Sequence, residues 1–275
     1  MRSENHPMFD FEIPTNQDPA MRSSLDERRP RKLSEIVGQA HIVTRISQAA
    51  KNGCLGRRYA FIGPTGSGKT TLAQATARTF FCPHSRELGD ACSECKICSL
   101  ANLPDHGAYH EWTGAELSEN WEWWNENGKA ILERSTWCFF LDEAQDLSPL
   151  HQKALFRQLE TARAMVIFAT THEHLVNDAL LGRFGANKFE VRRPTRIQAV
   201  DCMERHCQQL GVVATRDQLM AVARHYAENL RLCVDFVFTI KDQTTDGCVT
   251  DEFLKLVIGE ETSLAVPEIR ARVRL

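Results

Sequence analysis

The stretch that most constrains the fold of this sequence is residues 59–77, which read YAFIGPTGSGKTTLAQATA. From Gly63 to Thr70 it fits the phosphate-binding pattern G-x-x-x-x-G-K-[ST], which is informative when a strand precedes it and a helix follows. The apolar residues before Gly63 predict a buried strand, and the residues after Thr70 favour a helix. An ordinary glycine-rich turn is the weaker explanation, because such a turn needs no Lys-Thr pair after its last glycine. The sequence therefore predicts a loop that binds a nucleoside triphosphate.

Each part of this loop has a predicted role. Its glycines let backbone N–H groups turn toward phosphate oxygens at a helix N-terminus, whose partial positive charge favours an anion. Lys69 is expected to reach the β- and γ-phosphates, and the hydroxyl of Thr70 to complete the shell of a Mg²⁺ ion. The residues predicted to bind the nucleotide here are Gly63, Pro64, Thr65, Gly66, Ser67, Gly68, Lys69, Thr70 and Thr71.

The composition bounds the class of protein. A chain of 275 residues can form one large domain and a smaller one, and 43% hydrophobic with 25% charged residues is ordinary for a soluble protein. A net charge of -3 argues against a globally basic nucleic-acid binder, although it allows a local basic face. No apolar run approaches the roughly 18 residues of a membrane span, and acidic residues stand where a signal peptide needs apolar ones. We therefore expect a cytoplasmic protein without membrane partners.

Four of the ten cysteines fall within residues 82–98, as Cys82, Cys92, Cys95 and Cys98. Two overlapping C-x-x-C pairs and an upstream cysteine suit a tetrahedral Zn²⁺ site, because thiolates are the ligands that Zn²⁺ prefers in closed sites. Structural or redox thiols are the alternative. Four thiolates leave no open coordination position, so we expect a structural role in an insertion after the phosphate-loop helix.

A second buried strand is predicted at residues 137–145, which read WCFFLDEAQ. Such a strand delivers its carboxylates at its C-terminal end, where open α/β sheets place their ligands. Asp142 is expected to hold Mg²⁺ and Glu143 to polarise the attacking water. A further strand, Met165 to Thr170, ends in hydroxyls at the same edge, which by themselves indicate no more than a strand-end cap.

Residues 112–124 contain four of the five tryptophans, interleaved with glutamates. We predict an amphipathic helix with its aromatic side packed inward. The alternative is a stacking or partner surface, because exposed tryptophans favour interfaces.

Taken in order, these segments resemble the AAA+ ATPase subunits of clamp loaders, and most closely the gamma/tau motor subunits of bacterial DNA polymerase III. The matching segments, from Arg29 to about Asp242, are RP..LSEIVGQ (29–39), GPTGSGKTT, the four-cysteine insertion, FFLDEAQDLS, FATT followed by GRF (182–184), and ENLR (228–231). The cysteine insertion discriminates best, since most AAA+ proteins lack it. The intact phosphate loop separates the chain from related subunits that have lost ATP binding.

The resemblance implies roles that spacing alone does not. Thr171 matches the sensor-1 position, which reads the γ-phosphate, and Arg231 matches the sensor-2 arginine of the helical lid. Val37 lies in the segment (36–39) that borders the adenine. Arg183 matches the arginine finger that one subunit offers to the ATP of its neighbour. Such a finger raises the hydrolysis rate by about 10³ to 10⁵ where it has been measured. Without the resemblance, Arg183 would be interpreted as an ordinary surface arginine in a loop. The family has Ser-Arg-Cys where this chain has Gly182-Arg183-Phe184, which affects how the arginine is aimed.

The expected fold is an α/β AAA+ core with a mostly parallel sheet, a zinc-binding insertion and a small all-α lid. The expected parts are a flexible arm (1–28), the ATPase core (29–193) with the zinc module (82–98), the lid (194–259) and a tail (260–275). Lid helices are expected at 195–210, 215–227, 229–242 and 250–258, with threonine N-caps at Thr195, Thr215 and Thr250.

The predicted function is an ATP-binding and ATP-hydrolysing subunit of a clamp-loader-like assembly acting on DNA, using ATP, Mg²⁺ and Zn²⁺. Full activity is expected to need other AAA+ subunits, and a sliding clamp or another effector is a further expected partner. In the family a collar domain follows the lid, and we expect this chain to lack it. The alternative is an ATP-dependent regulator or scaffold of a phage, mobile element or defence system. A non-hydrolysing subunit is disfavoured by the presence of Glu143.

Overall fold

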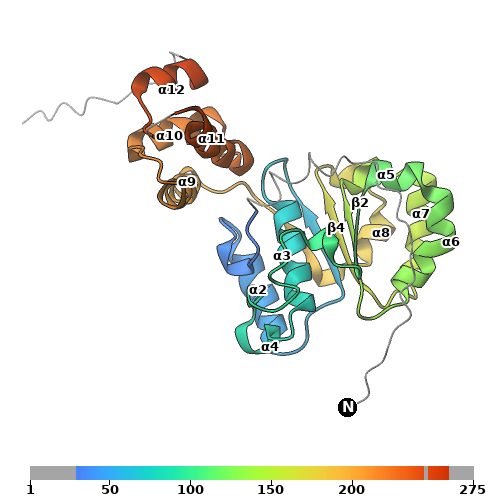
Figure 1. Ribbon diagram of the computed structural model, residues 1–275. Coiled ribbons are helices and arrows are strands. Elements are labelled where there is room, and N and C mark those ends of the chain that lie inside the picture. The colour runs from blue at the N-terminus through green and yellow to red at the C-terminus, as the bar shows by residue number, and fades with distance from the viewer. Residues whose placement is uncertain (1–28, 245–246, 260–275) are drawn as a thin grey trace, which may run out of the picture.

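The computed structural model describes residues 29–244 and 247–259, so the predicted arm (1–28) and tail (260–275) lie outside the described residues. The core is one sheet of five parallel strands in the spatial order β2-β3-β4-β1-β5 (Figure 1). The strands are β1 (Arg58–Ile62), β2 (Tyr109–Thr113), β3 (Cys138–Asp142), β4 (Met165–Thr170) and β5 (Lys188–Glu190). The predicted α/β fold with a parallel sheet is confirmed.

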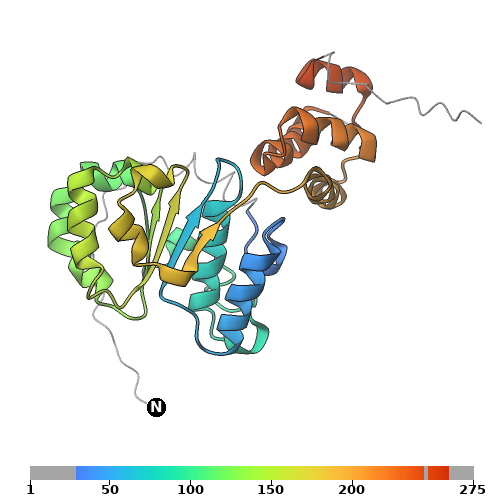
Figure 2. The same cartoon turned by 180° about the vertical axis from the view of Figure 1, so that it is seen from behind.

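Helices cover both faces of this sheet (Figures 1 and 2). Side chains alternate between the faces along each strand. On β1, Tyr59 and Phe61 pack into an apolar cluster with α2 and α3, whereas Ala60 packs into a second cluster on the opposite face. The helices are α2 (Ala40–Lys51), α3 (Lys69–Phe81) and α4 (Ser85–Leu88) on the first side, and α5 (Gly114–Glu119), α6 (Trp121–Leu132), α7 (Pro149–Gln158) and α8 (Asp178–Gly182) on the other. The short 3₁₀ helices are η1 (Leu33–Glu35), η2 (Leu103–Asp105), η3 (Ala144–Asp146), η4 (Glu173–Leu175) and η5 (Gly185–Asn187).

The tryptophan-rich segment is not one helix, so that prediction was wrong in its secondary structure. Trp112 lies in strand β2, and α5 and α6 follow it. The break has a local cause, because the hydroxyl of Thr113 accepts the backbone N–H of Glu116 and caps α5. The expected inward packing holds in part: Trp112 and Trp124 are buried, whereas Trp121 and Trp123 are partly buried against the same cluster.

The C-terminal helices form a separate small bundle (Figure 1). They are α9 (Arg196–Leu210), α10 (Arg216–His225), α11 (Leu230–Gln243) and α12 (Asp251–Ile258). Their N-caps are Thr195, Thr215, Asn229 and Thr250, each of which accepts a backbone N–H with its side chain. The bundle has its own buried apolar cluster, contributed by all four helices. Among the described residues no helix combines the length and apolarity that a membrane span requires.

The segment between the sheet and the bundle is held by the turn that precedes α2. Gln39 is fully buried, and its side-chain amide pairs with the backbone N–H and C=O of Arg192. Gly38 has φ +79°, and a Cβ there would lie 3.0 Å from Pro194. Helix α2 begins directly after this turn, at Ala40.

Candidate active site and metal centre

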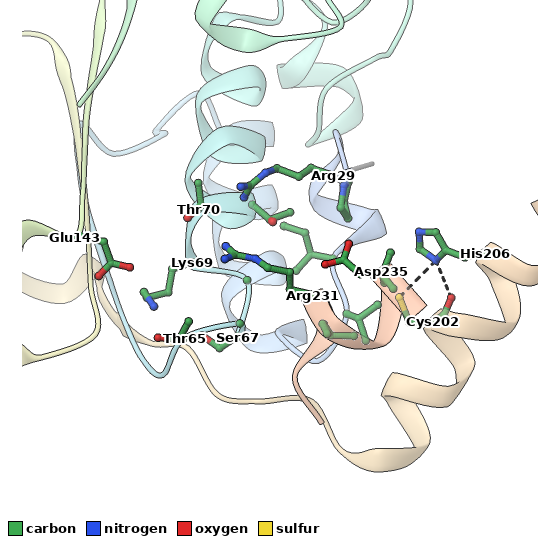
Figure 3. Close-up of a pocket in the computed structure, with 18 residues that line it drawn as sticks. Arg29, Thr65, Ser67, Lys69, Thr70, Glu143, Cys202, His206, Arg231 and Asp235 are labelled. Carbon is green, nitrogen blue, oxygen red and sulfur yellow. Dashed lines mark hydrogen bonds between the residues drawn. The ribbon is translucent and has the colours of Figure 1, made fainter. Parts of the chain in front are cut away.

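A cavity of about 160 Å³ lies at the C-terminal edge of the sheet, between the core and the helical bundle. The phosphate loop forms one wall of this cavity from Thr65 to Thr71, and Glu143 borders it. Of the other predicted residues, Val37 and Arg231 also line it. Figure 3 shows Arg231 reaching from the bundle toward the phosphate loop. The fold therefore gathers segments from across the sequence around one space.

The phosphate loop has a backbone that requires glycine. The N–H of Gly63 donates to Thr170 O at 3.1 Å, and a Cβ on Gly63 would lie 2.0 Å from Val191 O. Gly66 and Gly68 have φ values of +76° and +96°, which residues with a Cβ rarely adopt. The hydroxyl of Ser67 is buried and has no hydrogen-bond partner among the described residues. Since buried polar groups are normally satisfied, this loop fits a phosphate that would accept from it.

Lys69 is a buried cation at the start of α3. Its Nζ donates to Gly63 O at 2.9 Å and Pro64 O at 3.2 Å, so it folds back onto its own loop. Burial lowers its pKa, and the nearby carboxylates of Glu143 and Asp142 act in the opposite direction. Such an ammonium group, short of water and of anionic hydrogen-bond partners, fits a site for phosphate oxygens.

Thr70 and Asp142 are brought together from α3 and the end of β3. The Thr70 hydroxyl donates to Asp142 Oδ2 at 2.6 Å, and Asp142 Oδ1 accepts the N–H of Glu143 at 2.9 Å. Burial raises the pKa of Asp142. A hydroxyl and a carboxylate side by side at a phosphate site are oxygen ligands of the kind that Mg²⁺ takes.

Glu143 lies in a network that the sequence did not predict. Its backbone has φ +46°, a left-handed conformation that is costly for glutamate and is found mainly where function requires it. Gln145 donates to Glu143 Oε2 through its amide nitrogen, and its amide oxygen accepts from Thr170 Oγ1 and, at 3.2 Å, from the Thr171 N–H. The Thr171 hydroxyl also donates to Glu143 Oε2, at 3.2 Å. Gln145 therefore couples Glu143 to the end of β4, and its place two residues after Glu143 was the only signal for it.

Arg183, the predicted finger, does not line this cavity. It ends helix α8, where its guanidinium pairs with the carboxylate of Glu160 and lies over the ring of Phe156, 4.3 Å from the ring centroid. The structure thus gathers Lys69, Thr70, Asp142, Glu143 and Thr171 in one place but leaves Arg183 elsewhere. The role of each of these residues stays a prediction.

The four predicted cysteines form one cluster. The Sγ atoms of Cys82, Cys92, Cys95 and Cys98 all lie within 4.8 Å of one another. Backbone N–H groups of Cys95 and Cys98 point at the sulfurs of Cys92 and Cys95, at 3.2 and 3.5 Å. A hydrogen bond with His84 lowers the pKa of Cys92 to about 5, whereas burial raises the pKa of Cys82 and of Cys98. Four converging sulfurs with N–H donors directed at them fit a tetrahedral Zn²⁺ ion.

The cysteine cluster is tied to the N-terminal segment of the core. Asp90 accepts the backbone N–H groups of Leu33 and Ser34, at 2.8 and 2.9 Å. That turn leads directly into Ile36 and Val37, which line the cavity. On the α3 side, the guanidinium of Arg78 donates to the backbone carbonyls of Ile97, Leu100 and Ala101, at the C-terminal end of the cysteine stretch.

Comparison with known proteins shows which family this chain belongs to. The family described as "DNA polymerase III, delta subunit" matches residues 38–190. The chain belongs to this clamp-loader family of AAA+ proteins. It is 30% identical over 250 residues to the replication factor C small subunit of Methanoculleus marisnigri, covering 86% of this chain and 72% of that protein.

Other members of the clamp-loader family match over shorter parts. The DNA polymerase III subunit gamma/tau of Mycobacterium bovis is 30% identical over 192 residues, which are 67% of this chain and 33% of that protein. The chain therefore spans about a third of the length of that relative. Among solved structures, the Thermotoga maritima RuvB Holliday junction branch migration motor matches with a TM-score of 0.63 at 19% identity, covering 86% of this chain and 75% of that one. That likeness shows the AAA+ fold alone.

Proposed function

We propose that this chain binds and hydrolyses ATP as a subunit of a clamp-loader-type assembly that acts on DNA in replication. The observation that carries the proposal is the position of Glu143. It borders the same cavity as Lys69 and the phosphate loop, and Gln145 and Thr171 hold its carboxylate. A structural nucleotide site needs the loop but has no use for a carboxylate held in this way.

In this proposal the residues divide the work of phosphoryl transfer. Lys69 neutralises charge on the terminal phosphates, and Thr70 with Asp142 would hold Mg²⁺, whose charge also offsets that of the phosphates. Glu143 orients a water and accepts its proton as the water oxygen bonds to the γ-phosphorus and the bond to the bridging oxygen breaks. Thr171 contacts the γ-phosphate. ADP and phosphate are the products.

Residues 194–259 would act as a lid over the nucleotide, with Arg231 reaching the phosphates. The charge of Arg231 already acts on the pKa of Lys69, which supports their closeness. The cysteine cluster would hold a structural Zn²⁺ ion that stabilises the insertion at 82–98.

Arg183 would complete the site of a neighbouring subunit. Its absence from the lining of its own cavity supports action in trans. Its contacts with Glu160 and Phe156 have to be released for this. Hydrolysis would then depend on assembly, so the isolated chain should be a slow ATPase. The names of the relatives favour this replication role, and nothing in the comparisons favours the regulator or scaffold alternative.

The test is a complementation experiment in the ATPase assay. Arg183→Ala and Lys69→Ala should each lower the rate by about 10³ or more, and a mixture of the two should recover part of it, because one variant keeps the phosphate loop and the other the finger. Arg163→Ala, at an exposed arginine, is the matched control. The same assay with primed DNA, with and without a sliding clamp, tests the loader role. Wild-type turnover in the Arg183→Ala protein would contradict the finger assignment. An ATPase rate that does not change when primed DNA and the clamp are added would contradict the loader role.

A further inference from the structure

The nucleotide cavity has two chemically different ends (Figure 3). Lys69 and Glu143 lie at one end, and Cys202, His206 and Asp235 lie at the other, on helices α9 and α11 of the bundle. If ATP binds as proposed above, its phosphates occupy the loop and its base extends toward the second end. The inference below rests on that proposed function.

Part of the cavity wall is apolar. Ile36 and Val37 contribute from the core, and Leu230 and Val234 from the bundle. Apolar walls hold the flat face of any base, so they give affinity without choosing between bases. Selectivity has to come from polar groups that meet the edge of the base.

His206 is a polar group with a fixed hydrogen-bonding pattern. Its Nδ1 lies 2.9 Å from the backbone oxygen of Cys202, one helical turn earlier. A carbonyl oxygen only accepts, so Nδ1 carries the proton, and Nε2 of the neutral ring is an acceptor. Within the described chain, Nε2 has no hydrogen-bond partner, and the ring borders the cavity. The ring is further steadied by an edge contact with Phe238, at 6.1 Å between centroids.

We propose that His206 selects adenine by accepting a hydrogen bond from its 6-amino group at Nε2. Guanine and hypoxanthine carry an oxygen at this position, so two acceptors would face each other and both would lose water without gaining a partner. The carboxylate of Asp235 borders the same end of the cavity. His206 is thus a specificity-determining residue that acts on the base and not on the phosphates.

Calorimetric binding of nucleotides to the whole chain tests this assignment. Four ligands are compared: ATP, purine riboside triphosphate (which lacks the amino group), ITP and GTP. The wild type should bind ATP about tenfold more tightly than the purine analogue, the effect of one hydrogen bond, and should bind ITP and GTP more weakly still. His206→Phe, which keeps a ring, should bind ATP and the purine analogue equally. His206→Gln, which keeps an acceptor, should restore part of the preference.

The controls separate the possible failures. His225→Ala, at an exposed histidine of α10, should retain the wild-type preference. Equal binding of ATP and the purine analogue by the wild type would overturn the inference and leave the proposed function intact. Binding of no triphosphate at all would overturn the proposed function. If Asp235→Asn abolished the preference and His206→Phe kept it, the selection would belong to Asp235 and the assignment to His206 would be wrong.

Discussion

The cysteine cluster and the nucleotide cavity are built in opposite ways. All four sulfurs come from residues 82–98, and the N–H groups directed at them come from the same stretch. The cavity instead takes its lining from Arg29 to Asp235, and its key carboxylate is held by contacts that reach from β3 to β4. One site is therefore local, with an order that should depend on its metal, and the other exists only when the whole core has folded.

The largest effect expected from this contrast is that of metal removal. Stripping zinc with a chelator, or replacing Cys98 by Ser, should unfold the stretch 82–98, because zinc binding supplies on the order of 10 kcal/mol in small zinc proteins. Hydrogen exchange of the Cys95 and Cys98 amides should rise by at least about 100-fold, while that of buried amides in β4 should change little.

Cys54→Ser is the matched control, since Cys54 is exposed and outside the cluster. Zinc content should stay near one equivalent in that variant and fall below about half in Cys98→Ser. A wild-type protein purified with less than half an equivalent of zinc would contradict the zinc assignment. Exchange that rose equally throughout the sheet would show that the cluster is not local.

The same contrast explains what the sequence could predict. The cysteines, the phosphate loop and the Asp142–Glu143 pair are visible because their chemistry is set by spacing within a short segment. The lid helices were also predictable, since Thr195, Thr215 and Thr250 cap them locally. Strand β4 was predictable too, because its residues form one short apolar run.

Features that depend on pairing across the fold were missed. Strand β5 has three residues and exists through its pairing with β1. Strand β2 was not predicted, because its Trp112 continues the tryptophan-rich pattern of the helices that follow it in the sequence, α5 and α6. The contact of Arg183 with Glu160 joins residues that no motif relates. Likewise, the bridge of Gln145 to Thr170 depends on the neighbouring positions of β3 and β4.

The second prediction tests the distributed site. Glu143→Gln keeps the shape of the side chain and one oxygen that can accept hydrogen bonds from Gln145 and Thr171, but it cannot take up a proton as a carboxylate does. The ATPase rate should fall by about 10² to 10⁴, whereas ATP affinity should be unchanged or slightly tighter, since a negative charge near the phosphates is lost. Glu126→Gln, at an exposed glutamate of α6, should leave both unchanged. Wild-type turnover in Glu143→Gln would mean that another group activates the water.

The smallest expected effect tests whether the two regions are as separate as their construction implies. Asp90, next to the cluster, accepts the N–H groups of Leu33 and Ser34, and this turn leads into Val37 of the cavity. Asp90→Ala should therefore loosen the wall of the nucleotide site and weaken ATP binding by about fivefold, or about 1 kcal/mol. Zinc content should not change, because none of the four thiols is altered.

Asp105→Ala serves as the control for Asp90→Ala, since Asp105 is exposed in η2 and lies outside the cavity lining. Calorimetry of ATP binding and zinc analysis on the same samples separate the outcomes. Weaker ATP binding with full zinc content would show that Asp90 transmits the order of the cluster to the cavity, because the variant loses its hydrogen bonds to Leu33, Ser34 and Ala91 but keeps all four thiols. Unchanged ATP affinity would mean that the hydrogen bonds between Gln39 and Arg192 are enough to fix this wall of the cavity. The cysteine cluster and the nucleotide cavity would then be energetically independent of each other.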